Sequence, residues 1–146
     1  MKKELLLKMN EYLSDCAIEY VKLHNLHWNV IGPQFKPVHE YLETLYNSVT
    51  DTLDEVAELI KIYGGIPLGR YHDYIEHATI KEIDNVDYEV HRALEIVRDD
   101  LSYLKKASEE IRSLADKEEL PDIVSSMEDK IIEYNKNIWF INSMLR

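Results

Sequence analysis

The chain has 146 residues, a length that suits one domain with a substantial core, and we expect residues 1–146 to form that single domain. It carries 28 acidic and 17 basic residues, which gives a formal net charge of −11. No apolar run approaches the roughly 20 residues that a membrane span needs. The acidic balance argues against DNA binding, because DNA-binding proteins neutralise phosphates with clustered lysines and arginines.

Two features of the first helix region bear on the compartment. Cys16 is the single cysteine, so no internal disulfide can form, and this fits a reducing cytoplasm. The segment from Met1 to Lys8 has a basic start, but its apolar run is only three residues long. We therefore interpret it as the start of a helix rather than a signal peptide, and we expect a cytoplasmic protein.

Apolar residues recur at helical spacing over four long segments, at about 3 to 30, 36 to 63, 86 to 115 and 121 to 145. Gly32-Pro33 ends the first segment and Gly64-Gly65 ends the second. The connection 64–85 is unusually long, and Tyr71 to His77 are expected to form one or two helical turns within it. These elements predict an all-α fold, a ferritin-like four-helix bundle with a long crossover between helices 2 and 3. An up-down bundle without metal is the alternative.

The usual di-iron motif of such bundles is absent. Di-iron carboxylate bundles place Glu-x-x-His on two helices that point into the core. The residues three positions before the six histidines are Val21, His24, Lys36, Gly69, Tyr74 and Tyr88. None is Glu or Asp, so the sequence predicts no di-iron site inside the bundle.

Candidate metal ligands lie instead on the first two helices. His27 and His39 stand on either side of the turn between them, so an antiparallel pair of helices brings them face to face. Asp54 and Glu58 are four residues apart on one face of the second helix, a sound spacing for a metal pair. Imidazole and carboxylate together suit iron, zinc or manganese.

These four ligands cannot meet within one chain. Asp54 lies fifteen residues beyond His39 on the same expected helix, which is roughly 22 Å along its axis. Metal–ligand bonds are about 2 Å long. A second copy related by a two-fold axis can supply the missing half, and the symmetry then builds two such sites at once.

The stretch from His24 to Gly65 closely resembles the Dps family, the miniature ferritins. The matching residues are Leu23-His24-Asn25-Leu26-His27-Trp28-Asn29-Val30-x-Gly32-Pro33, Phe35, His39-Glu40, Asp54-Glu55-x-Ala57-Glu58 and Gly64-Gly65-x-Pro67-Leu68, with a weaker match at Lys136-Asn137-Ile138-Trp139. The resemblance covers most of the chain, and the His-Trp-Asn-Val-x-Gly-Pro core followed by His39 is highly specific.

The resemblance implies a homo-oligomer, a hollow dodecamer with ferroxidase sites at its two-fold interfaces. His27 and His39 would come from one subunit, and Asp54 and Glu58 from its partner. The family usually has Asp four positions after His39, whereas this chain has Glu43, a residue one methylene longer that can still ligate directly or through water. Trp28 would lie beside the site and receive oxidising equivalents.

The function implied is that of a ferroxidase that binds Fe²⁺, oxidises it with hydrogen peroxide and stores the ferric mineral, with Zn²⁺ a competitor for the same ligands. Two alternatives remain open. One is a DNA-binding nucleoid-protection protein with little ferroxidase activity, and the other is a shell that stores iron without fast oxidation. The corner Asp116–Asp122 would line three-fold pores for Fe²⁺ by the same resemblance, and a solvated turn is the alternative there.

Plainer interpretations accompany the individual residues. A lone histidine on an apolar face is more often a packed core residue, so His27 is favoured as a ligand only because the surrounding motif comes with it. His24 either orients Glu43 through a hydrogen bond or simply packs. Asp54 and Glu58, taken alone, would form an exposed acidic face. Tyrosines at helical positions are expected to pack rather than to relay electrons.

Overall fold

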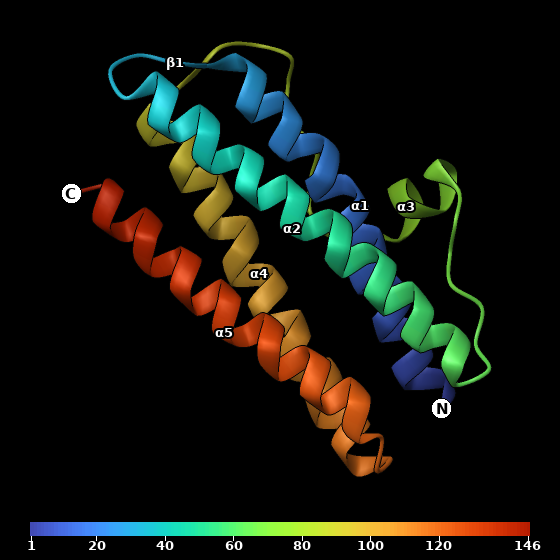
Figure 1. Ribbon diagram of the computed structural model, residues 1–146. Coiled ribbons are helices and arrows are strands. Elements are labelled where there is room, and N and C mark those ends of the chain that lie inside the picture. The colour runs from blue at the N-terminus through green and yellow to red at the C-terminus, as the bar shows by residue number, and fades with distance from the viewer.

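The structure is a computed structural model that describes residues 1–146, and five helices account for most of it. The long helices are α1 (Lys3–Asn29), α2 (Phe35–Ile62), α4 (Val90–Lys117) and α5 (Pro121–Met144), and the short one is α3 (Tyr71–His77). Figure 1 shows the four long helices side by side, with α3 set against α1 in the crossover between α2 and α4. The predicted all-α bundle with one long crossover and a short helix within it is confirmed.

The turn between α1 and α2 is tied to the end of the crossover by a short parallel strand pair. β1 (Val30–Ile31) pairs with β2 (Tyr88–Glu89), with Val30 opposite Tyr88 and Ile31 opposite Glu89. These strands were not predicted. Because β2 takes up Tyr88 and Glu89, α4 begins at Val90 rather than near residue 86. Gly32 follows β1 with a φ of +109°, and a Cβ there would lie 3.2 Å from the Glu89 carboxylate. The positive φ favours glycine here, whereas the flexible Glu89 side chain can move aside for a Cβ.

The core runs the full length of the bundle. Its fully buried side chains come from all four long helices and include Leu5, Leu13, Leu26, Leu42, Ile60, Leu94, Leu104, Ile111 and Ile123. Burial of each such side chain contributes about 1.5–3 kcal/mol relative to its exposure. None of the helices combines the length and the hydropathy that crossing a bilayer would require.

Two buried polar residues of α1 hold the crossover against the bundle. Asn10 accepts a hydrogen bond from the backbone N–H of Leu68 at 2.9 Å. Asp15 accepts the backbone N–H groups of Thr79 and Ile80 at 2.7 and 2.8 Å. Because these carboxylate and amide groups satisfy backbone donors that would otherwise lack partners, they fix the course of the long connection.

A charged cluster lies buried on the bundle side of this crossover. The Lys22 ammonium contacts the Asp100 carboxylate at 2.8 Å. Glu19 is completely buried next to this pair, and neither of its carboxylate oxygens has a hydrogen-bond partner. Burial, reinforced by the nearby Asp100 carboxylate, raises the pKa of Glu19 well above its usual value.

Candidate metal centre

His27 and His39 face each other across the α1–α2 turn, as the antiparallel arrangement predicts. His27 lies near the end of α1 and His39 in the second turn of α2. Their rings stack with centroids 3.7 Å apart and planes inclined by 13°. His27 is 6% exposed and His39 is half-buried.

Each of the two histidines hydrogen-bonds to the backbone of the other. His27 Nδ1 lies 2.6 Å from the carbonyl oxygen of His39, and His39 Nδ1 lies 2.7 Å from the carbonyl oxygen of His27. A carbonyl oxygen can only accept, so both Nδ1 atoms carry the hydrogen. In the neutral rings the lone pair is then on Nε2. This atom makes no hydrogen bond within the chain, so its lone pair is available to bind a metal ion.

Glu43 lies one turn beyond His39, and its carboxylate is exposed. Its Oε1 accepts a hydrogen bond from the Tyr46 hydroxyl at 3.0 Å. His24 makes no hydrogen bond to Glu43, and its Nδ1 donates to the Tyr20 carbonyl at 2.8 Å. The His24 ring packs on Tyr46, with centroids 3.8 Å apart. Packing is thus the correct one of the two interpretations of His24.

Tyr46 was expected only to pack, and its hydrogen bond to Glu43 was not predicted. The signal was present in the spacing, because Tyr46 is three residues after Glu43 and seven after His39, on the same face of a helix. Its ring also meets the His27 ring edge-on at 5.3 Å. Partial burial, followed by the hydrogen bond to Glu43, raises the pKa of Tyr46.

Asp54 and Glu58 lie toward the other end of α2, both exposed. Neither carboxylate takes part in an ion pair, whereas the adjacent Glu55 turns toward α5 and contacts Lys130 at 2.6 Å and Ser126 at 2.7 Å. Because α2 is one unbroken helix, Asp54 stays roughly 22 Å from His39 along the axis. The chain holds no group of three or more His, Cys, Asp or Glu side chains that could bind a metal ion.

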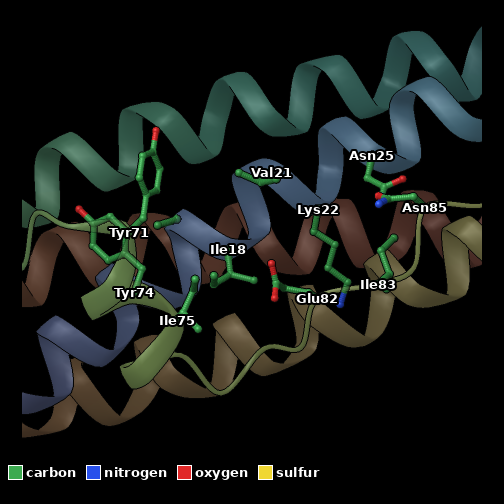
Figure 2. Close-up of a pocket in the computed structure, with 11 residues that line it drawn as sticks. Ile18, Val21, Lys22, Asn25, Tyr71, Tyr74, Ile75, Glu82, Ile83 and Asn85 are labelled. Carbon is green, nitrogen blue, oxygen red and sulfur yellow. The ribbon is translucent and has the colours of Figure 1, made fainter.

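Large apolar side chains are exposed beside the histidine pair and along the groove between α1 and α3. Trp28, next to His27, is 66% exposed, and Phe35 stacks on His39 with centroids 5.2 Å apart. Farther along α1, Val21 borders a hollow of about 310 Å³ between α1, α3 and the crossover, which Figure 2 shows with Tyr71 and Ile75 at its α3 side. Tyr71 and Ile75 are among the most exposed apolar residues of the chain.

Comparisons with known proteins agree with this fold. A ferritin-like domain model matches residues 6–146. The chain is 31% identical to the DNA protection during starvation protein of Brevibacillus brevis, over 94% of this chain and 91% of that protein. The crystal structure of a Dps protein from Bacillus brevis matches all of both chains with a TM-score of 0.94 at 27% identity.

A further solved structure links the fold to iron chemistry. The Dps protein of Vibrio cholerae O1, described as a member of a broad superfamily of ferritin-like diiron-carboxylate proteins, matches with a TM-score of 0.92 at 27% identity. The match covers 99% of this chain and 90% of that one. With a domain model matching nearly its whole length and relatives of this identity and coverage, the chain belongs to the ferritin-like proteins and, among them, to the Dps family.

Proposed function

We propose that the protein is an iron-sequestering ferroxidase whose active sites form where two copies of the chain meet. His27, His39 and Glu43 of one copy and Asp54 and Glu58 of the other would bind Fe²⁺, the substrate. The observation that carries the proposal is that four of these residues, His39, Glu43, Asp54 and Glu58, lie on α2. The helix is continuous, and His39 and Asp54 lie within about 60° of each other around its axis, so one exposed face presents both.

The donor set suits the oxidation of iron. Neutral imidazole binds Fe²⁺ moderately, and the carboxylates favour Fe³⁺ because they are hard anionic ligands. With hydrogen peroxide as oxidant, two ferrous ions each give up one electron. The peroxide takes up two protons and leaves as two water molecules. Ordering His27 and His39 before iron arrives lowers the cost of binding, because each ring is already held by the other's backbone.

Storage would follow from a hollow homo-oligomer, which we propose is the dodecamer of the Dps family. Ferric product held as mineral inside such a shell leaves neither Fe²⁺ nor peroxide free to generate hydroxyl radicals. Zn²⁺ would compete for the same imidazole and carboxylate ligands. The net charge of −11 per chain would concentrate cations around the shell.

Entry of Fe²⁺ at the corner between α4 and α5 is the related proposal. Asp116, Glu119 and Glu128 line an open hollow of about 530 Å³ there. Glu118 is engaged instead with the backbone N–H of Lys2 at 2.7 Å. Glu128 forms an ion pair with Arg112 at 2.8 Å, whereas Asp116 and Glu119 make none. If several copies bring this corner together, the carboxylates of Asp116 and Glu119 would form a ring of negative potential that attracts divalent cations.

The direct test is peroxide-driven Fe²⁺ oxidation by the assembled protein, followed by stopped-flow absorbance. The double substitution His27→Ala with Asp54→Ala removes one ligand from each half of the site, and we expect the oxidation rate to fall to that of iron and peroxide alone. The matched control is His91→Ala with Asp129→Ala, which removes the same residue types from exposed positions on α4 and α5. A wild-type rate in the first variant would show that the site is elsewhere.

A further inference from the structure

Tyr46 makes contact with both helices that supply the histidine half of the proposed site. Its hydroxyl donates to Glu43 Oε1 at 3.0 Å, and its ring edge faces the His27 ring at 5.3 Å. Its ring also stacks on His24 at 3.8 Å. Tyr46 therefore contacts a candidate carboxylate ligand and a candidate imidazole ligand together.

The Tyr46 ring is itself firmly held. His24 lies flat on one face of it, with planes inclined by 22°, and the His24 ring is fixed in turn by its 2.8 Å hydrogen bond to the Tyr20 carbonyl. The Tyr20 ring meets Tyr46 edge-on at 6.3 Å. The hydroxyl therefore has a defined position over the exposed surface of α2, because its ring has little room to turn.

Glu43 needs such a partner more than a shorter carboxylate would. It is exposed, has three rotatable side-chain bonds and makes no ion pair in the chain. A glutamate in this setting occupies several rotamers, and fixing one of them on metal binding has an entropic cost. The bond from Tyr46 occupies Oε1 and leaves Oε2 free, so the carboxylate is held with one oxygen available.

We propose that Tyr46 is a positioning residue that holds Glu43 as a cation ligand at the interface between two copies. The inference rests on the proposed function, because Glu43 can act as a ligand only if the site exists. Tyr46 does not touch the metal ion. It acts through the Glu43 carboxylate, as residues that orient metal ligands commonly do, and such residues typically contribute about 10- to 100-fold to metal affinity.

The test uses Tyr46→Phe, which removes the hydroxyl and keeps the ring stacked on His24. The probe is Co²⁺, titrated into the assembled protein and followed by its visible absorption, which reports affinity and ligand geometry without any oxidation. We expect Co²⁺ affinity to fall about 10-fold and the absorption band to change. Tyr74→Phe is the matched control. It removes another tyrosine hydrogen bond, from the Tyr74 hydroxyl to the Leu68 carbonyl at 3.0 Å in the crossover, and should leave Co²⁺ affinity unchanged.

A second pair of variants separates positioning from a general structural effect. Glu43→Ala should weaken Co²⁺ binding, and adding Tyr46→Phe to it should cause no further loss, because Tyr46 acts only through Glu43. Wild-type affinity in Tyr46→Phe, or independent losses that multiply in the double variant, would overturn the inference. Wild-type affinity in Glu43→Ala would overturn it too, even if Tyr46→Phe does not assemble.

The same Co²⁺ titration tests the role of Tyr46 separately from the existence of the proposed metal site. His27→Ala removes a proposed ligand directly and should abolish tight Co²⁺ binding. If His27→Ala binds Co²⁺ like the wild type, the proposed site itself is wrong. If His27→Ala loses binding and Tyr46→Phe keeps it, the site stands and only the role of Tyr46 is refuted.

Discussion

Mixing two inactive variants should restore activity if the ligands come from two chains. One variant lacks the histidines, through His27→Ala with His39→Ala. The other lacks the carboxylates, through Asp54→Asn with Glu58→Gln. Each variant alone has no complete site. In a two-fold pair of one copy of each, one site combines both defects and the other combines the intact histidines with the intact carboxylates.

The size of the restored activity follows from this symmetry. In shells refolded from an equal mixture, a given site has intact histidines half of the time and, independently, intact partner carboxylates half of the time. The expected rate is therefore about one quarter of the wild-type rate per subunit, and it falls on either side of the equal mixture. A site built within one chain would give no activity at any ratio. The roughly 22 Å between His39 and Asp54 along α2 is the reason that we expect the first result.

Stopped-flow absorbance with Fe²⁺ and peroxide measures the rate, and native mass spectrometry verifies that the shells contain both variants. Shells of the two variants that are assembled separately and then mixed provide the control, because they contain no mixed pairs. If shells shown to be mixed remain as inactive as the separate variants, the assignment of the ligands to two chains is refuted.

Two further predictions concern pH and DNA. Burial next to Asp100 raises the folded-state pKa of Glu19 above its ordinary value, so its favourable contribution to folding is present at low pH and is lost as pH rises through the raised pKa. Glu19→Gln stays neutral at every pH, so its Tm relative to wild type should rise between pH 5 and pH 8 in calorimetry, whereas parallel curves would contradict this account. The assembled protein should not retard duplex DNA in a gel at about 150 mM salt without divalent metal, because −11 per chain repels phosphate, and robust retardation would favour the DNA-binding alternative.

The helices and the histidine pair were predictable because their signals are local. Gly32-Pro33 follows the first helix and Gly64-Gly65 follows the second. The turn between the two helices is short, so His27 and His39, at similar distances on either side of it, lie opposite each other. The β1–β2 pair was not predictable, because two-residue strands carry no periodicity and their pairing depends on where the crossover returns.

Side-chain partners were harder to predict than helix positions. Sequence spacing brings both His24 and Tyr46 close to Glu43, and only the side-chain directions decide which of them forms the hydrogen bond. The sequence around Glu19 also gave no indication that this residue is buried. A glutamate on an apolar helix face is usually solvated or paired, and its complete burial here depends on how α4 and the crossover cover α1.

The unbroken helix α2 also sets the distance between the two ligand sets, and this distance constrains how two copies can assemble. If the histidine end of one copy must meet the carboxylate end of the other, the two α2 helices run antiparallel and only one register satisfies both sites. The two-fold axis then passes halfway between the two ligand sets, near Asn47 and Thr50, both exposed on α2. One turn of slippage would shift each ligand set by about 5.4 Å and break both sites together. The chemistry of the iron site would thereby select the geometry of the dimer.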